Sequence, residues 1–372
     1  MKRFFIILAF AFSGFHAHGQ SVMQSGNWVK AEIPVSGIYK ISYQKLRELG
    51  FQNPENVRIF CGNAGMLPFY NKEKRQNFLE TLIYNSDNAV YFYANGADTW
   101  SYDTDEQMYL VKKHLFSEVN YYFLSDVNTG KDNAIKTSQS TAIQTISEGD
   151  FYYSHEEDLV NLQMSGRDWF GENFFYNTSQ NFTFNCNNAP LTGKIKFSLA
   201  ARSSVSNTFT VTAANASKTG TCTGVSNSGL YASRTTESFD FSPQNTEKQE
   251  VNVTFNKNSA SAEGYLDYII LNTTEPLTYK GKQMIFSKYF SSPNTAEILT
   301  DGVNLWNITD YLSPIFGKTV NCKEGKNDFI VFNLSDAFEI EKFEKIENQN
   351  LHELQTPEYL IITPEIFQPY AE

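Results

Sequence analysis

The sequence predicts a mainly β protein: a small mixed α+β amino-terminal domain, then a β-sandwich of jelly-roll type, then the start of an α/β segment. Runs of alternating apolar and polar residues recur through residues 181–345, between turns rich in Asn, Ser, Gly and Thr. Aromatic residues make up 15% of the chain, and heavy use of Phe and Tyr is typical of strands. Near the end, the apolar run 359–362 precedes Thr363 and Pro364, which suit an N-cap and a first helical residue.

Residues 1–19 have the pattern of a cleaved secretory signal peptide. Lys2 and Arg3 precede an unbroken apolar run, residues 4–12, and small residues stand before a cleavage site at Gln20. A membrane anchor is the weaker interpretation, because a membrane-spanning helix needs about 20 apolar residues and this run is shorter. No later stretch is long and apolar enough to span a membrane, so we expect no transmembrane helix.

The chain is acidic, with 30 Lys and Arg against 41 Asp and Glu and a formal net charge of −11. Binding to nucleic acid and electrostatic binding to anionic lipid both need clustered basic residues. The charge balance therefore predicts neither partner, and it fits an exported protein.

Residues 20–149 form the predicted mixed α+β domain. Residues 28–33 and 38–42 have the composition of strands, and Pro34 and Gly37 between them predict a β-hairpin. Three further strands are expected, at residues 57–61, 89–93 and 120–124. No glycine-rich turn follows any of these strands, which argues against a nucleotide-binding fold.

A short helix is predicted directly after the second strand. Ser42 is a fitting N-cap, and apolar residues recur at three-residue spacing within residues 43–49. Gly50 is a fitting residue to end the helix, because helices often close on a glycine with positive φ.

The stretch 150–180 is predicted to connect the two domains. Ser154 and Glu157 match a capping box and Gly166 is a fitting stop, which together predict a helix. The sandwich follows over residues 181–345. Its clearest alternating strands are 195–201, 209–213, 251–255 and 266–270.

The last part of the chain is predicted to be a linker followed by a βα segment. The sequence becomes polar from Phe343, and residues 346–357 are the predicted linker. Residues 358–372 are the predicted first βα segment of an α/β domain, since a short apolar run feeds a helix through a tight turn. A parallel strand needs neighbours, so we expect the run 359–362 to be poorly paired or docked only on the sandwich.

Three acidic stretches carry oxygen ligands or acid–base groups. Residues 155–158, His-Glu-Glu-Asp, suit the first turn of a helix better than a metal site, because carboxylates there complement the helix dipole. Asp126 and Asp132 bound a stretch that resembles a calcium loop, but its spacing departs from the EF-hand pattern, and a turn after a strand is favoured. The loop of Asp103 and Asp105 is interpreted in the same way. We predict no metal site and no cofactor.

The chain has four cysteines, Cys61, Cys186, Cys222 and Cys322. None stands in a Cys-x-x-Cys pair, which argues against zinc. Cys186 and Cys222 fall in the same β-rich region and could pair in an oxidising compartment, but three pairings are possible and the sequence does not choose among them. Unpaired apolar residues in strands are the favoured interpretation.

Neither histidines nor tryptophans define a site in the sequence. The histidines beyond the signal peptide are His114, His155 and His352. None has a Ser or Cys beside it in a nucleophile motif, so no catalytic residue is predicted. Three tryptophans could stack on sugars: Trp100, Trp169 and Trp306. In so aromatic a chain, tryptophans are more often core residues.

Several short motifs follow one another in an order that resembles one family. They are SGIYKIS (36–42), NPENVRI (53–59), GNAGMLP (62–68), HEED (155–158), SGRDWFGE (165–172), AARS (200–203), YLDY (265–268), NQNLH (348–352) and EYLIIT (358–363). Together they resemble the amino-terminal half of the PorU-like sortases of the Bacteroidota type IX secretion system, whose peptidase domain belongs to the gingipain family of cysteine peptidases. The resemblance covers nearly the whole chain after the signal peptide.

The resemblance implies that the whole protein is a cell-surface cysteine peptidase and transpeptidase. Such proteins remove the carboxy-terminal sorting domain of secreted cargo and attach the cargo to an anionic lipopolysaccharide. The family's catalytic Cys and His lie on a caspase-like α/β domain, which here begins at about Glu358. No position of this chain matches them, and Cys322 and His352 precede that domain, so neither is assigned to a catalytic dyad.

The resemblance also implies a location and partners. We expect secretion across the inner membrane and a final place at the outer membrane, on the cell surface or outside the cell. The expected partners are protein substrates that carry a sorting domain, and outer-membrane secretion components. This chain itself is expected to be a non-catalytic scaffold for docking.

Two other functions remain as alternatives. A secreted β-sandwich module that binds glycans or proteins explains the signal peptide and the sandwich, but not the βα pattern near the end. A standalone enzyme that uses carboxylates such as Glu156 and Asp158 is the weaker alternative.

Overall fold

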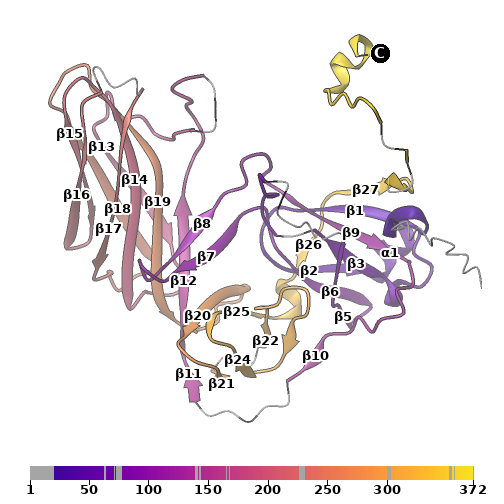
Figure 1. The fold of residues 1–372 in the computed structure, drawn as a ribbon. Coiled ribbons are helices and arrows are strands. Elements are labelled where there is room, and N and C mark those ends of the chain that lie inside the picture. Colours follow the sequence, from indigo (N-terminus) through magenta and orange to yellow (C-terminus); the bar gives the residue numbers. More distant parts are fainter. Residues whose placement is uncertain are drawn as a thin grey trace, which may run out of the picture.

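The computed structural model describes residues 21–371, apart from 63, 71, 73–77, 139–140, 142–143, 165, 167, 226–230, 300–302, 352–353 and 356. The predicted signal peptide and His352 lie outside the described residues. The chain is mainly β, as predicted. Its strands form three layered units, an amino-terminal sandwich, a jelly roll and a smaller central unit that joins them (Figure 1).

The amino-terminal sandwich packs a five-stranded sheet, β27-β1-β9-β3-β4, against a four-stranded sheet, β26-β2-β6-β5. Its strands are β1 (Trp28–Ile33), β2 (Gly37–Ser42), β3 (Arg58–Cys61), β4 (Leu79–Thr81), β5 (Tyr84–Ser86), β6 (Ala89–Ala94), β9 (Asn120–Ser125), β26 (Phe338–Glu339) and β27 (Phe343–Ile346). Apolar side chains from both sheets meet in one core, which includes Ile33, Ile41, Phe92 and Leu124. The predicted strands of this domain therefore form.

The predicted helix is α1 (Tyr43–Glu48). Ser42 Oγ accepts the backbone N–H of Lys45 at 3.1 Å, so the N-cap prediction is confirmed. Gly50 follows with a φ of 98°, a conformation that favours glycine and closes the helix. The other short helical turns here are η1 (Val22–Gln24), η2 (Pro54–Asn56) and η3 (Leu334–Asp336).

β1 and β2 do not form the predicted hairpin. β1 pairs with β9 and β27, whereas β2 pairs with β6 and β26 in the opposite sheet. Ile33 of β1 and Ile41 of β2 lie in the same core, which they enter from opposite layers. Residues 34–36 therefore carry the chain from one layer to the other, because burying both strands in full outweighs local pairing.

The jelly roll consists of two four-stranded layers. One is the sheet β13-β18-β15-β16, and the other is the β12-β19-β14-β17 part of a nine-stranded sheet. Its strands are β12 (Glu148–His155), β13 (Ser179–Asn185), β14 (Thr192–Arg202), β15 (Asn207–Ala213), β16 (Ala216–Cys222), β17 (Ser233–Phe241), β18 (Lys248–Asn256) and β19 (Glu263–Pro276). This strand order is that of a jelly roll, so the predicted sandwich class is confirmed. Phe197, Phe209, Val253 and Leu266 lie in its core.

The helix predicted from Ser154 to Gly166 does not form. Ser154 and His155 are the last residues of β12, where they pair with Ile270 and Ile269 of β19. The capping signal is overridden because β12 is the first strand of the jelly roll and its pairing with β19 runs along its whole length. The jelly roll thus begins at Glu148, just before the predicted connector 150–180, and includes the start of that stretch.

The central unit continues the nine-stranded sheet beyond β12. It adds β20 (Met284–Phe290), β25 (Gly325–Phe332), β22 (Asn304–Asn307), β23 (Ile315–Phe316) and β10 (Lys136–Thr137). A three-stranded sheet packs on it, formed by β11 (Gln144–Ile146), β21 (Asn294–Ile298) and β24 (Thr319–Cys322). Phe286, Ile298, Val320 and Phe329 share the core between these sheets. The alternating strands of residues 181–345 do not distinguish this unit from the sandwich in the sequence.

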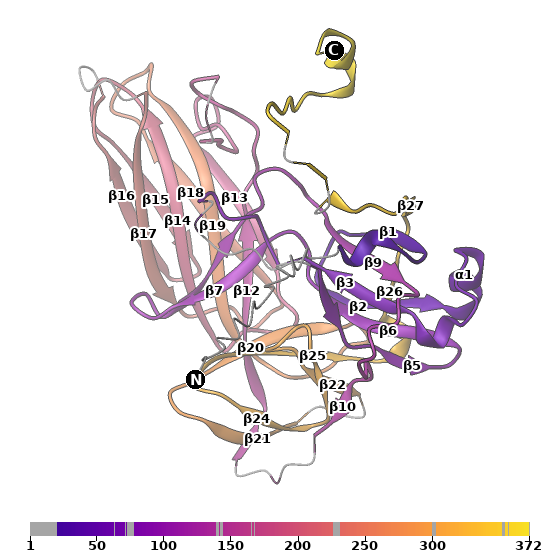
Figure 2. The same cartoon turned by 45° about the vertical axis from the view of Figure 1, so that its right-hand side comes forward.

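A two-stranded hairpin, β7 (Thr99–Asp103) and β8 (Met108–Lys112), reaches from the amino-terminal sandwich toward the jelly roll (Figures 1 and 2). We call it the arm. Its aromatic rings lie on the nine-stranded sheet, with Trp100 against Tyr152 and Tyr102 against Tyr289, each pair at a centroid distance of 4.5 Å. The arm therefore ties the amino-terminal sandwich to the other two units.

The last described residues, 354–371, form a tail that stands away from the three units (Figure 2). The run 359–362 forms no strand, so the strand prediction is wrong, although the expectation of poor pairing holds. Its side chains are exposed, Tyr359 by 83% and Ile362 by 90%. A 3₁₀ helix, η5 (Glu365–Tyr370), follows with Pro364 as its N-cap in place of Thr363.

Two further observations complete the fold. β27 begins at Phe343 and pairs with β1, so the polar stretch from Phe343 is a strand before it becomes a connection. Among the described residues, no helix has the length and apolar character needed to cross a membrane.

Candidate functional site

The four cysteines are all buried and free, so Cys186 and Cys222 form no disulfide. Burial raises the pKa of Cys61 and Cys186 to about 12, and that of Cys222 and Cys322 to about 11. A thiol attacks as its thiolate, which these pKa values suppress at neutral pH. The cysteines are therefore buried core residues whose thiolate form is disfavoured.

His155, from the predicted acidic stretch, is brought to Glu172 and not to a metal site. Its Nε2 lies 2.8 Å from Glu172 Oε1, at the end of β12. This hydrogen bond raises the pKa of His155, against the effect of partial burial. For Glu172, burial alone would raise the pKa, but the hydrogen bond from His155 helps to lower it. The two side chains form a partly buried hydrogen-bonded pair, which is an ion pair when His155 is protonated; the second oxygen of Glu172, Oε2, is buried without a hydrogen-bond partner among the described residues.

The remaining acidic stretches are turns. Asp103 Oδ1 accepts the backbone N–H groups of Asp105 and Glu106, at 2.9 and 3.0 Å. Asp126 follows β9 directly, and its Oδ1 accepts the N–H of Asn27 at 2.8 Å. In the part of the chain that the structure describes, no group of three or more His, Cys, Asp and Glu residues is placed to hold a metal ion.

The three tryptophans considered for sugar stacking do not share one surface. Trp306 is fully buried, and Trp169 is 44% exposed in the loop between β12 and β13. Trp100 lies on the arm, where it packs against Tyr152. Trp100 also lines a cavity, and this cavity is the candidate site of the molecule.

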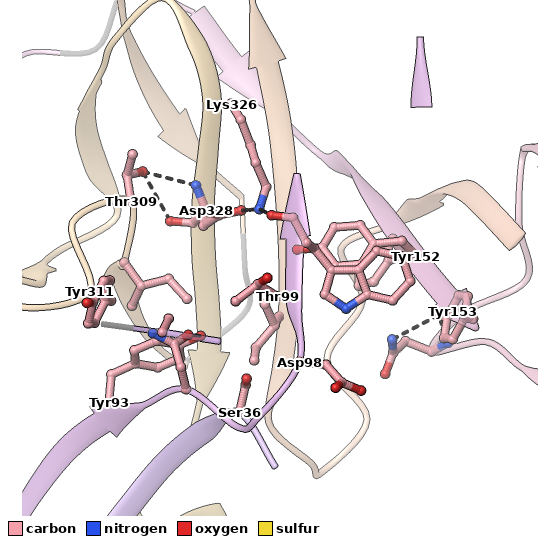
Figure 3. Close-up of a pocket in the computed structure, with 17 residues that line it drawn as sticks. Ser36, Tyr93, Asp98, Thr99, Tyr152, Tyr153, Thr309, Tyr311, Lys326 and Asp328 are labelled. Carbon is pink, nitrogen blue, oxygen red and sulfur yellow. Dashed lines mark hydrogen bonds and ion pairs between the residues drawn. The ribbon is translucent and has the colours of Figure 1, made fainter. Parts of the chain in front are cut away.

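The cavity has a volume of about 290 Å³ and lies where the arm leaves the amino-terminal sandwich and meets the nine-stranded sheet. Figure 3 shows its lining, which comes from segments far apart in the sequence. The residues that matter for its chemistry are Ser36, Tyr93, Asp98, Trp100, Tyr152, Lys326 and Asp328.

One wall carries a connected set of polar side chains from β12, β20 and β25. Lys326 Nζ lies 3.1 Å from Asp328 Oδ1 and donates a hydrogen bond to the backbone oxygen of Trp100 at 3.2 Å. Ser287 donates to Asp328, and its Oγ lies 3.1 Å from the hydroxyl of Tyr152. The charge of Lys326 is therefore already compensated by Asp328.

The opposite wall comes from the amino-terminal sandwich and the start of the arm. Asp98 Oδ1 accepts the backbone N–H of His114 at 2.8 Å. Tyr93 donates its hydroxyl to Asn95 Oδ1 at 3.1 Å. Burial raises the pKa of Tyr93, and the negative charge of Asp328 raises it further. The lining of the cavity thus contains both aromatic rings and two carboxylates, those of Asp98 and Asp328.

Sequence reasoning singled out Trp100 but missed the rest of this site. Asp98 stands two residues before Trp100, and this spacing is the only local signal. Lys326 and Asp328 alternate along β25, so both face one side of the sheet, as a strand periodicity requires. Their meeting with Asp98 depends on how the units pack, which no local pattern reveals.

A second candidate surface is the tail. Apolar side chains that are exposed there are Leu354, Tyr359, Leu360, Ile361, Ile362, Ile366, Phe367 and Tyr370. An exposed apolar group of this density is typical of a segment that packs against another protein surface. The described residues of the chain supply no such surface to the run 359–362, which pairs with no strand.

The chain has the fold of one solved structure over nearly all of its length. The crystal structure of dimeric latent PorU from Porphyromonas gingivalis matches 91% of this chain with a TM-score of 0.79 and 24% sequence identity. The match covers 34% of that chain, so this chain spans about a third of its length. The fold is therefore PorU-like.

Other solved structures resemble this chain only weakly. A carbohydrate-binding module CBM36 in complex with calcium and xylotriose matches 33% of this chain, but with a TM-score of 0.20 and 13% identity. No protein-family model matches the chain, and no curated protein matches it significantly.

Proposed function

We propose that this chain is the amino-terminal, non-catalytic part of a PorU-like sortase, an exported cysteine peptidase of the type IX secretion system. The observation that carries the proposal is the PorU-like fold over 91% of the chain. The ordered motifs between residues 36 and 363 support it independently. In this proposal the whole protein processes the carboxy-terminal sorting signals of secreted cargo at the cell surface.

The proposal assigns catalysis to a gingipain-type domain outside this chain. The four buried thiols support this assignment, because their raised pKa values make them poor nucleophiles. The 34% coverage of the PorU chain leaves room for such a domain in the whole protein.

We propose that the tail is the first segment of the catalytic domain and packs against the rest of that domain. The apolar side chains of the tail are exposed to water. A partner that buried them would stabilise the complex by about 25 cal/mol for each Å² of apolar surface buried. Tyr359 and Ile362 are almost fully exposed, so their burial would make a large contribution. The units upstream then act as a rigid scaffold, because the arm links the amino-terminal sandwich to the nine-stranded sheet.

Purified chain from Gln20 onward tests the assignment of catalysis. It is incubated with a model cargo that carries a carboxy-terminal sorting domain, and cleavage is followed by mass spectrometry. We expect no cleavage by this chain and cleavage by a longer protein that includes the peptidase domain. Cleavage by the chain alone would contradict the proposal.

Substitution in the tail tests the contact. Leu360→Ser with Phe367→Ser should leave the melting temperature of this chain unchanged, because both side chains are exposed. In the longer protein the same pair should lower the melting temperature and the cleavage rate. Leu191→Ser, an exposed leucine on the jelly roll, is the matched control and should change neither. If the tail and control variants had the same melting temperature and cleavage rate in the longer protein, the docking role would be wrong.

A further inference from the structure

The cavity between the arm and the nine-stranded sheet carries one carboxylate whose charge has no cationic partner. Asp98 receives only the backbone N–H of His114, at 2.8 Å. Among the described residues, no Lys, Arg or His forms an ion pair with it. The one cation in the lining, Lys326, is held at 3.1 Å by Asp328. The lining therefore carries a net negative charge.

The negative charges also act on titratable groups near the cavity. The pKa of Tyr93 and that of Tyr152 are raised, first by burial and next by the charge of Asp328. Burial raises the pKa of Glu156, which lies outside this cavity, to about 7; Lys113 opposes this, and the charges of Asp267, Asp158 and Asp98 add to it. A cation that entered the cavity would be favoured by this field, and an anion would be repelled.

The aromatic lining suits a cation as well. Lys326 Nζ lies 5.5 Å from the ring centroid of Tyr152, a lining residue, which is cation–π geometry. Trp100 lines the same cavity, and its larger ring lies beside that of Tyr152 at a centroid distance of 4.5 Å. Tryptophan is the strongest of the aromatic side chains in this interaction.

The size of the cavity limits the ligand. Its volume of about 290 Å³ is at the lower end of small-molecule sites, which range over about 300–1,000 Å³. It corresponds to roughly ten water molecules, at about 30 Å³ each. A single side chain or a small amine fits this volume, whereas a folded segment does not.

We propose that this cavity binds an organic cation, a guanidinium or an alkylammonium group, with Asp98 as its ion-pair partner and Trp100 as its aromatic face. The group can come from a free small molecule or from an Arg or Lys side chain of a peptide. The proposal is independent of the sortase function and stands if that function fails.

Calorimetric titration of the purified chain tests the site. The probes are the N-acetyl methylamides of arginine and lysine, with that of citrulline as a neutral isostere of arginine, and the peptide Gly-Gly-Arg-Gly-Gly. We expect at least one cationic probe to bind. If arginine binds, citrulline should bind at least about tenfold more weakly, because both the ion pair and the cation–π contact are lost. Tighter binding of the peptide than of the single residue identifies a peptide source, and equal binding identifies the side-chain group alone.

Variants locate the binding. Asp98→Asn keeps the oxygen that accepts the N–H of His114, so the fold is retained, and it should weaken cation binding about tenfold. Asp105→Asn makes the same change of charge at the exposed tip of the arm and should have no effect. The proposal is overturned if no cationic probe binds, if neutral citrulline binds as tightly as the best cationic probe, or if Asp98→Asn binds that probe as tightly as the unchanged chain.

Discussion

The side-chain amide of Asn272 pairs with the backbone of Tyr109 as a neighbouring strand would. The N–H of Tyr109 donates to Asn272 Oδ1 at 2.5 Å, and Asn272 Nδ2 donates to the carbonyl oxygen of Tyr109 at 3.0 Å. Both residues are buried, with 8% and 2% of their surface exposed. One side chain of β19 thus satisfies both polar groups of a residue on the arm, which fixes where the arm lies on the sheet.

Replacing this amide should loosen the arm. Asn272→Ala leaves a buried N–H and a buried carbonyl without partners, and we expect a loss of roughly 2–4 kcal/mol in the free energy of unfolding. Urea denaturation followed by circular dichroism measures the change. Asn256→Ala is the control, because Asn256 is exposed and bonds only threonine hydroxyls, and it should cost less than about 1 kcal/mol. Equal effects of the two substitutions would show that the arm is not held by Asn272.

Glu156 should make the stability of the chain depend on pH. Burial raises its pKa in the folded state to about 7 from an ordinary 4.5, with Asp267, Asp158 and Asp98 adding to the shift and Lys113 opposing it. The folded state therefore keeps a proton that the unfolded state releases between about pH 4.5 and 7. Since the unfolded state binds fewer protons there, stability falls as the pH rises through this window.

Glu156→Gln removes this dependence. We expect the variant to be more stable than the unchanged chain at pH 8, by on the order of 1–2 kcal/mol after solvent screening, and close to it at pH 4. Denaturant midpoints at several pH values measure the difference. Glu157→Gln, at the exposed neighbouring position, is the control and should show no comparable gain. A variant that is less stable at pH 8 would contradict the assignment.

The cysteines should be protected by the fold and not by a disulfide. All four are buried, and their pKa values of about 11–12 disfavour the thiolate. We expect almost no alkylation by iodoacetamide in native buffer, and alkylation of all four in denaturant without a reducing agent. Mass spectrometry counts the labels. Loss of two labels, at Cys186 and Cys222, would instead reveal a disulfide, and rapid native labelling of any thiol would contradict its burial.

Sequence patterns predicted those parts of the fold that are decided locally. The cap at Ser42, the stop at Gly50 and the alternation of strands such as β15 and β18 are each visible within a few residues. The jelly-roll class followed from the recurrence of such strands between polar turns. These features could be predicted because each residue's environment is set by neighbours in the sequence.

The failures share one physical cause, which is competition from distant partners. Ser154 and Glu157 carry a valid capping signal, but β12 gains more from pairing with β19 over its full length. Likewise, β1 and β2 give up a local hairpin so that Ile33 and Ile41 face one core from two layers. The cavity follows the same rule, since Asp98 and Asp328 come to line one cavity only once the arm and the central unit are packed.

The most deeply buried carboxylate of the jelly roll carries the last prediction. Glu275 is fully buried, and its Oε1 accepts the hydroxyl of Tyr153 at 2.8 Å and that of Thr273 at 2.7 Å. Its Oε2 accepts the N–H of Asn188 at 2.8 Å. Burial and the charge of Glu275 both raise the pKa of Tyr153, so the phenol stays protonated and donates. Each of these three partners is thus a donor, so Glu275 must act as an acceptor in every bond.

Glu275→Gln turns one of these acceptors into an amide donor that faces another donor. We expect a loss of about 1–3 kcal/mol in the free energy of unfolding, because one buried N–H or hydroxyl is left unsatisfied. Tyr153→Phe should cost a similar amount, since its hydroxyl also accepts from Asn187. The double variant should lose less than the sum by about 1 kcal/mol, because both changes break the same bond. Tyr231→Phe, at an exposed ring, is the control. Strict additivity of Glu275→Gln and Tyr153→Phe would show that the hydrogen bond between these side chains does not stabilise the fold.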